Sequence, residues 1–151
     1  MTDTVSKGRR SWNMSRIKSG DTKPELFVRS LLHRHGFRFR LHVKNLPGKP
    51  DIVLPKYHAV IFVHGCFWHR HPGCKNASTP KQNAVFWQEK FRTNVARDKQ
   101  VLAQLRELGW HTHVIWECEC GEVTERIMKI MRFPEKFIER TAPAYSQHHF
   151  P

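Results

Sequence analysis

Hydrophobic residues in the first half of the chain follow two periods in succession. Between Asp21 and Gly36 they recur at the spacing of one helical face; Asp21 and Thr22 are candidate N-caps, and Gly36 is a natural C-terminal stop. From Phe37 to Val43 apolar residues alternate mainly with basic ones, which is the period of a strand with one buried face. The pattern therefore predicts a helix followed directly by a strand.

The most apolar segment lies near the middle of the chain. It predicts two strands, over 51–54 and 58–64, joined by a short turn at 55–57. The run from Ala59 to Val63 is apolar at every position, so both of its faces should be buried and it is expected at the centre of a sheet. Residues 65–83 show no period and are rich in polar residues, cysteine, histidine and proline.

The second half begins with a long amphipathic pattern. It predicts a helix from about Ala84 to Leu108 that stops at Gly109, then a strand over 110–118 and a last helix over 122–131. Residues 133–151 show no clear period and form an unassigned C-terminal tail. The resulting order α-β-β-β-α-β-α predicts an α/β fold in which a mixed β-sheet is flanked by helices.

The composition shows a large positive charge that is unevenly distributed along the sequence. The 151 residues, enough for one domain, carry 26 Lys and Arg against 13 Asp and Glu, a net charge of +13. Twelve of the basic residues but only three of the acidic ones lie in residues 1–50. Such an excess indicates a polyanionic partner, nucleic acid before an anionic membrane. Because no apolar run reaches the length of a membrane span and no signal peptide is evident, we expect no membrane association and a cytoplasmic location.

The basic charge is densest in the first twenty residues. They mix lysine and arginine with serine, asparagine and glycine, which favours an arm that becomes ordered on a partner. A solvated, disordered terminus would have the same composition. Trp12 and Met14 favour the arm, because a purely solvating tail does not need large apolar side chains.

The four cysteines are too few for a disulfide scaffold, and their spacing is typical of a metal site. Cys66, His71 and Cys74 lie close together, and Cys118 ends a predicted strand. Structural Zn²⁺ prefers four such ligands in a tetrahedron, so we predict a zinc site that fixes residues 65–83 to the sheet. Scattered buried cysteines are the alternative, and His64, His69 and Cys120 are competing ligands.

A second set of residues suggests hydrolytic chemistry. Asp51 opens one predicted strand, His64 closes the next, and Glu25 lies in the first turn of the opening helix. Together with His69 they could support Mg²⁺-assisted phosphodiester hydrolysis, in which carboxylates bind the cation and a histidine moves protons. Taken singly, Asp51 also suits a turn and Glu25 also suits a helix N-terminus.

Several segments, taken together and in order, carry a resemblance to one enzyme family. The most specific is the His-Gly-Cys-Phe-Trp-His run, which occurs in order with a Pro-Asp and a Trp-Glu-Cys segment. The matching residues are Leu46 to Asp51, Val60 to His69, Phe86 to Lys90, Leu108 to Trp110 and Trp116 to Cys118, with Asn94, Arg97 and Asp98. With these segments the chain resembles the very-short-patch-repair (Vsr) mismatch endonucleases over about residues 7–132. The resemblance implies a restriction-endonuclease-like core and divides the chain into a basic DNA-contacting arm (1–21), an endonuclease domain (22–132) and the tail (133–151).

The resemblance also implies roles for the chemical residues. Asp51 and the backbone carbonyl of Val63 would hold Mg²⁺, and His69 would be the general base, supported by His64 and Glu25. The family's structural zinc ligands match Cys66, His71, Cys74 and Cys118. The Glu-x-Lys of many nucleases is absent, so the chemistry is expected to use histidine in place of lysine.

The resemblance further implies DNA contacts. Phe67, Trp68 and Trp87 would wedge beside the mismatched pair from the major groove, and Met14 would enter from the other side. Lys90 and Asn94 would contact the T:G pair. On pattern alone Trp87 could equally be a core residue of the long helix.

The function implied is a Mg²⁺-dependent, strand-specific endonuclease. It would recognise double-stranded DNA with a T:G mismatch, left by deamination of 5-methylcytosine, and nick the thymine strand 5′ to the thymine. We expect a monomer on the bacterial nucleoid, with mismatch-repair proteins as candidate partners. Two alternatives remain: a zinc-stabilised DNA-binding module without catalysis, and an endonuclease of the same fold that cuts matched DNA.

Overall fold

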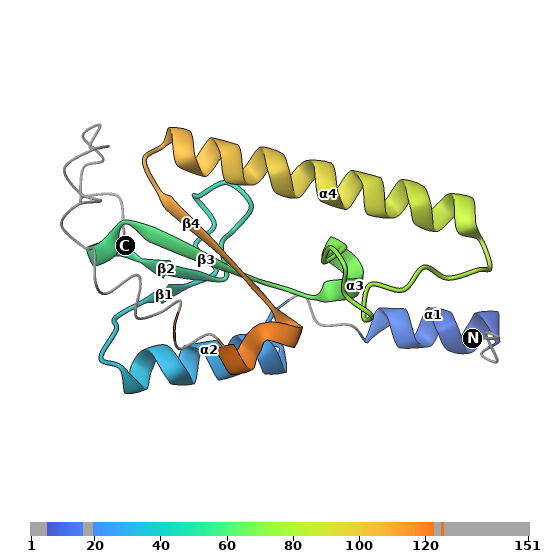
Figure 1. The fold of residues 1–151 in the computed structure, drawn as a ribbon, viewed down its shortest axis with the longest axis horizontal. Coiled ribbons are helices and arrows are strands. Elements are labelled where there is room, and N and C mark those ends of the chain that lie inside the picture. The colour runs from blue at the N-terminus through green and yellow to red at the C-terminus, as the bar shows by residue number, and fades with distance from the viewer. Residues whose placement is uncertain (1–5, 17–19, 123–124, 126–151) are drawn as a thin grey trace.

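The structure, a computed structural model, describes residues 6–16, 20–122 and 125 (Figure 1). The helix expected over 122–131 and the tail 133–151 lie outside this part, apart from Glu122 and Glu125. Within it the predicted class is confirmed: the fold is mixed α/β, with helices on both faces of a mixed sheet.

The sheet has four strands in the order β1-β2-β3-β4. Strands β1 (Arg40–Leu41), β2 (Ile52–Leu54) and β3 (Ala59–His64) pair antiparallel, and β4 (His111–Trp116) runs parallel to β3. The 3₁₀ turn η1 (Pro55–Tyr57) joins β2 to β3. The apolar run of β3 is an inner strand, as predicted.

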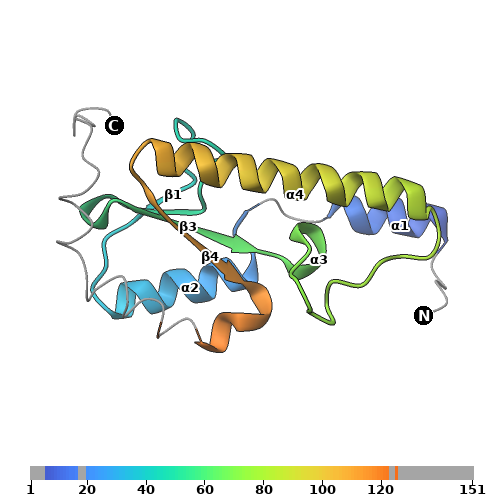
Figure 2. The same cartoon turned by 45° about the horizontal axis from the view of Figure 1, so that its top comes forward.

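Two helices cover the sheet from opposite sides (Figures 1 and 2). Helix α2 (Lys23–Arg34) lies on one face together with the 3₁₀ segment η2 (Glu117–Glu122), and the long helix α4 (Ala84–Glu107) spans the other. A one-turn helix, α3 (Cys66–His69), follows β3 directly and packs on α4. This arrangement places the end of β3 between the two helical layers.

Alternating residues of β2 and β3 build two hydrophobic cores. Ile52 and Ile61 face α2 and pack with Val28 and Leu32, which are fully buried. The intervening residues of both strands face α4 in a second cluster that contains Leu46, Val53, Val60, Phe62, Leu105 and Trp110. Burial on both faces explains why β3 is apolar throughout.

The start of α2 forms as the sequence predicts. Thr22 is the N-cap, and its Oγ1 accepts a hydrogen bond from the Glu25 N–H at 3.4 Å. The Glu25 carboxylate in turn accepts from the backbone N–H of Asp21 at 3.0 Å, close to the reciprocal pattern of a capping box. Gly36, at φ +80°, follows the helix end in the left-handed conformation that glycine favours.

The basic N-terminal segment contains a helix that the sequence pattern did not predict. Residues Lys7–Ser15 form α1, whereas the pattern suggested only an arm that becomes ordered on a partner or a disordered terminus. Ser6 caps the helix by accepting from the Arg9 N–H at 3.3 Å. Helix α1 buries none of its own residues and lies beside the segment leading into α4, where Arg10 donates to Gln82 Oε1 at 3.3 Å (Figures 1 and 2).

Two predicted strand boundaries were also wrong, and one short helix was missed. The strand expected over 37–43 pairs only at Arg40–Leu41, because His42 takes up a left-handed conformation, φ +46°, that ends the ladder. The last strand stops at Trp116, so Cys118 lies in η2. The segment expected to be irregular contains α3. No helix in the described ranges is both long and apolar enough to cross a bilayer.

Candidate active site and cysteine cluster

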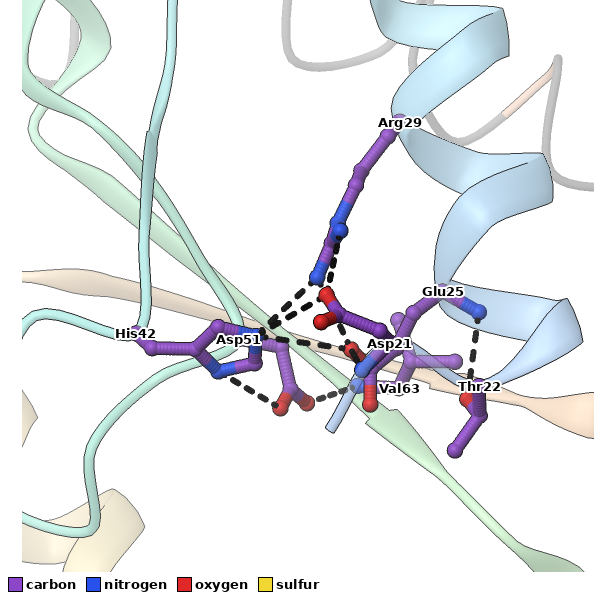
Figure 3. Close-up of polar contacts among 7 residues, drawn as sticks. All are labelled: Asp21, Thr22, Glu25, Arg29, His42, Asp51 and Val63. Atoms are coloured by element: carbon purple, nitrogen blue, oxygen red, sulfur yellow. Dashed lines mark hydrogen bonds and ion pairs between the residues drawn. The ribbon is translucent and has the colours of Figure 1, made fainter. Parts of the chain in front are cut away.

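Asp51 directly precedes β2, and each of its carboxylate oxygens faces a different polar neighbour. Its Oδ2 accepts a hydrogen bond from the backbone N–H of Val63 on β3 at 2.8 Å, and its Oδ1 lies 4.0 Å from Nδ1 of His42 (Figure 3). The side chain is 17% exposed. The antiparallel pairing of β2 and β3 is what brings this carboxylate to the end of the central strand.

Burial raises the pKa of Asp51 from 3.8 to about 6. The Val63 N–H counteracts this rise by stabilising the carboxylate, the negative charge of Glu25 adds to it, and His42 and His69 oppose it. Asp51 is therefore ionised near neutral pH, and its ionisation lowers the free energy of unfolding. Perturbed carboxylates of this kind are common in active sites.

This cost predicts a pH-dependent stability difference between wild type and Asp51→Asn. Because the pKa is raised in the folded state, the folded chain binds more protons than the unfolded chain between about pH 4 and pH 6, so stability is lost as pH rises through this window. In buffer without added Mg²⁺, Asp51→Asn should be more stable than wild type at neutral pH by on the order of 2 kcal/mol.

Denaturant unfolding at several pH values measures this difference, which should close near pH 4. Glu107→Gln, which changes an exposed carboxylate at the end of α4, is the matched control. A constant difference across the pH range would show that ionised Asp51 carries no such cost.

Glu25 is buried and already engaged. Besides the Asp21 N–H, its Oε2 accepts from Nη2 of Arg29 at 3.1 Å, and it lies 3.7 Å from Nε2 of His42. The side chains of Glu25 and Asp51 thus lie on opposite sides of the His42 ring (Figure 3). The structure joins these two predicted residues through His42 and not directly.

The two predicted histidines meet at the end of β3, where His64 directly follows Val63, the hydrogen-bond partner of Asp51. The rings of His64, at the end of β3, and His69, in α3, stack at 3.9 Å, and His69 Nδ1 lies 2.6 Å from Oδ2 of Asp98 on α4. When Nδ1–H donates to this carboxylate, Nε2 of His69 keeps its lone pair and can accept a proton. Burial, followed by the neighbouring His69, lowers the pKa of His64 to about 4, so His64 is neutral near pH 7.

Three residues of this site received no role from the sequence. Asp98 lies 29 residues from His69, and Arg29 lies 13 residues from His42, although its contact with Glu25 is local to α2. Asp98 had a signal, since it belongs to the segments that carry the family resemblance. His42 had only its place on the basic face of a predicted strand, which does not distinguish it from its neighbours.

The four predicted zinc ligands converge beside α3, which begins at Cys66. The ligand atoms of Cys66, His71, Cys74 and Cys118 all lie within 4.8 Å of one another. His71 Nδ1 is 3.7 Å from the Cys66 sulfur and 3.3 Å from that of Cys118. Cys120 is outside this group, with its sulfur 4.0 Å from the Trp116 carbonyl. Three thiols and an imidazole are a donor set that suits Zn²⁺.

Protonation and neighbouring contacts are consistent with such a site. Burial raises the pKa of the Cys66 thiol to about 12 and also raises that of Cys118, so these thiolates would need the charge of a cation. Glu117 Oε1 accepts from the Cys66 N–H at 3.1 Å, and the His71 ring stacks on Trp116 at 4.4 Å. These contacts tie the cluster to the end of β4.

The predicted DNA-wedging aromatics form one cluster between α3 and α4. Phe67 packs edge-on against Trp68 at 5.2 Å and against Trp87 at 5.6 Å. Trp87 is only 7% exposed, which fits the core alternative in this state. Asn94 is also buried, and its Nδ2 donates to the Trp68 carbonyl at 3.1 Å, so it supports Trp68.

Other predicted DNA contacts are exposed. Lys90 lies on the outside of α4, and Met14 is 38% exposed on α1. The most exposed large hydrophobic residues among those described, Val85 and Phe86, lie in the first turn of α4 and were not predicted as contacts. The aromatic cluster itself is held by Arg70, which lies 4.0 Å over the Phe91 ring.

Comparisons with known proteins agree with the resemblance. The family described as DNA mismatch endonuclease Vsr matches residues 2–76. The type II nicking enzyme V.XorIIP of Xanthomonas oryzae is 49% identical over 82% of this chain and 90% of its own length. The type II nicking enzyme V.NmeAIP of Neisseria meningitidis is 43% identical, covering 87% and 96%. The DNA mismatch endonuclease Vsr of Escherichia coli is 44% identical, covering 78% and 75%.

Proposed function

The chain belongs to the Vsr family of DNA mismatch endonucleases, and from this premise we propose that it recognises a T:G mismatch and nicks the thymine strand. Family membership makes it a DNA endonuclease, a hydrolase of phosphodiester bonds. The finer proposal is that the nick lies 5′ to a thymine produced by deamination of 5-methylcytosine and starts very-short-patch repair. The observation that supports endonuclease chemistry is that Asp51 is hydrogen-bonded to the end of β3, where His64 stacks on His69 and His69 pairs with Asp98, with Phe67 and Trp68 on the same short helix as His69.

We further propose that Asp51 holds Mg²⁺, with the Val63 carbonyl as a second ligand. The donor set fits, because Mg²⁺ in nucleases takes one or two carboxylates and completes its shell with waters and substrate phosphates. When bound, Mg²⁺ would help to activate water and stabilise charge on the phosphate. The sheet would then correspond to a restriction-endonuclease-like core.

The chain's own residues would handle the proton. His69 Nε2 accepts it from the attacking water, while the Asp98 carboxylate at Nδ1 stabilises the resulting imidazolium. His64 stacks on His69 and stays neutral, so it limits the ring's motion without adding positive charge. Glu25 would influence Asp51 indirectly, because its carboxylate lies next to His42 and the other side of the His42 ring faces Asp51.

Recognition would use the aromatic cluster and α1. Phe67, Trp68 and Trp87 would insert beside the mismatch, at an unstacking cost of a few kcal/mol per step that is smallest where pairing is already weak. Met14 would enter from the opposite groove, and Lys90 would contact the T:G pair, with Asn94 beside it. A Zn²⁺ ion on the cysteine cluster would fix α3 and hence these rings.

One cleavage experiment separates this proposal from its alternatives. Matched and T:G duplexes are incubated with the protein and Mg²⁺, each strand carrying its own label. Cleavage that requires the mismatch supports the proposal. Equal cleavage of both duplexes favours an endonuclease for matched DNA, and binding without cleavage favours a non-catalytic zinc-stabilised module. The enzyme should act as a monomer, and adding mismatch-repair proteins tests whether they stimulate it.

The basic residues of the N-terminal segment should contribute affinity more than specificity. Lys7, Arg9 and Arg16 are exposed on or beside α1, so we expect them to contact phosphates. Changing all three to glutamine should reduce the slope of log K against log salt by roughly 2 to 3, since each phosphate contact contributes about 0.9. Matched and T:G duplexes should be weakened alike.

Fluorescence anisotropy across a salt series measures both effects. A variant with Lys56, Lys99 and Arg106 changed to glutamine removes the same charge elsewhere and should change the slope less. If the two triple variants behaved alike, the special role of the N-terminal charges would be wrong.

A further inference from the structure

Arg29 occupies the centre of a polar cluster behind Asp51. Its side chain, only 12% exposed, reaches from α2 to three partners: Nη1 is 2.7 Å from Oδ1 of Asp21, and Nη2 is 3.1 Å from Oε2 of Glu25 and 3.0 Å from Nε2 of His42 (Figure 3). Asp21, Glu25 and His42 are close enough together to surround a cation. The guanidinium already supplies that positive charge.

The contact between Arg29 and His42 fixes where the imidazole proton resides. A guanidinium has only donors, so a hydrogen bond from Nη2 requires Nε2 of His42 to be the acceptor. The carboxylates of Asp21 and Glu25 lie 3.8 and 3.7 Å from Nε2, beyond hydrogen-bond distance, and do not compete. The ring proton is therefore on Nδ1, the nitrogen that faces Asp51 Oδ1 at 4.0 Å.

The backbone and a close neighbour hold the ring in this orientation. His42 has φ +46°, a conformation that is uncommon outside glycine and that structures retain when their surroundings enforce it. Its N–H donates to the Asp51 carbonyl at 3.3 Å. A Cβ added to Gly20 would lie 3.2 Å from Cε1 of the ring, so the chain at Gly20 passes close to His42.

We propose that Arg29 holds His42 in the Nδ1–H tautomer and that this N–H, which faces Oδ1 of Asp51 at 4.0 Å without a direct hydrogen bond, orients the carboxylate electrostatically. The Val63 N–H holds the other oxygen by a hydrogen bond, so one oxygen has a direct donor and the other faces the His42 N–H at longer range. Arg29 and His42 are positioning residues and touch no reacting atom. The tautomer follows from the geometry alone, whereas the effect on cleavage rests on the proposed function.

Nitrogen-15 NMR of the histidine rings tests the tautomer without any assay of activity. Loss of one ring signal set in His42→Asn identifies His42 among the 11 histidines. Wild type should show Nδ1–H at neutral pH, and Arg29→Met should shift His42 towards the Nε2–H tautomer that is commoner in free histidine. Arg34→Met, which removes an exposed arginine at the end of the same helix, should leave the signals unchanged.

An Nε2–H tautomer in wild type would overturn the proposal. So would retention of Nδ1–H in a folded Arg29→Met. Since the wild-type spectrum is decisive, the test does not depend on the variant folding.

Nicking rates test whether the orientation of His42 affects cleavage. Arg29→Met should lower the Mg²⁺-dependent rate by roughly 10- to 100-fold, as loss of outer-shell partners commonly does, while its affinity for the T:G duplex matches that of Arg34→Met. His42→Asn should keep most of the rate, because asparagine tolerates the left-handed conformation and offers an N–H near the Nδ1 position. His42→Leu should be as slow as Arg29→Met.

Equal rates for His42→Leu and wild type would contradict the positioning role. If wild type itself failed to nick, the proposed function would be wrong, and the tautomer result would still stand on its own.

Discussion

Asp51→Asn should nick a T:G duplex more slowly than wild type by on the order of 10³-fold or more, with nearly unchanged binding. The substitution keeps the size of the side chain, and its amide oxygen can still accept from the Val63 N–H. It removes the charge that would hold Mg²⁺ and so the proposed catalytic group. Single-turnover cleavage and anisotropy measure the two properties separately.

Asp51→Ala should lose cleavage in the same way, and Glu107→Gln should nick at the wild-type rate. Appreciable residual nicking by either Asp51 variant would contradict the assignment of the metal-binding carboxylate. The stability gain expected for Asp51→Asn makes loss of fold an unsuitable explanation for its inactivity.

Cys66→Ser should lose bound zinc and a large part of its stability. Cys66 is fully buried at the start of α3, and its sulfur faces the other three predicted ligands. Residues 65–83 contribute little to the two hydrophobic cores, so an ion on this cluster would supply much of their order. We expect a loss of about 3 to 5 kcal/mol, which lowers the Tm by roughly 10 °C.

Metal analysis of the purified protein and thermal unfolding test this expectation. Cys120→Ser is the matched control, because its sulfur lies outside the cluster. Unchanged metal content and Tm in Cys66→Ser would show that the cluster is not a structural zinc site.

Asp51 and His64 have opposite effects on the pH dependence of stability. The raised pKa of Asp51 costs stability as pH rises through about 6, whereas the lowered pKa of His64 costs stability as pH falls from 6.5 towards 4. Each group is held in the form that the proposed chemistry needs near neutral pH: an ionised carboxylate and a neutral imidazole. The fold therefore bears an energetic cost at the end of β3.

The sequence predicted features that depend on local pattern or on specific ligand chemistry. The apolar run of β3, the caps of α2 and the extent of α4 follow from residue periodicity, and the structure confirms them. The structure also confirms that the cysteine cluster converges; its spacing left His64, His69 and Cys120 as competing ligands, and the family resemblance agreed with the four residues chosen.

Features that depend on long-range contacts could not be predicted. Nothing near His42 in the sequence indicates that Arg29 contacts its ring, or that its backbone turns left-handed and shortens β1. The pairing of His69 with Asp98 likewise requires α3 to pack on α4. Helix α1 was missed because its polar, basic composition resembles that of a disordered tail, and it buries no residue of its own.

Mapping the nick on a single T:G duplex, with a different label on each strand, tests the central claim most directly. In Mg²⁺ the wild-type protein should produce one product, from the thymine strand, that ends immediately 5′ to the mismatched thymine, and Asp51→Asn should produce none. Cleavage of both strands, or equal cleavage of the corresponding matched duplex, would contradict the proposed mismatch-specific nicking activity.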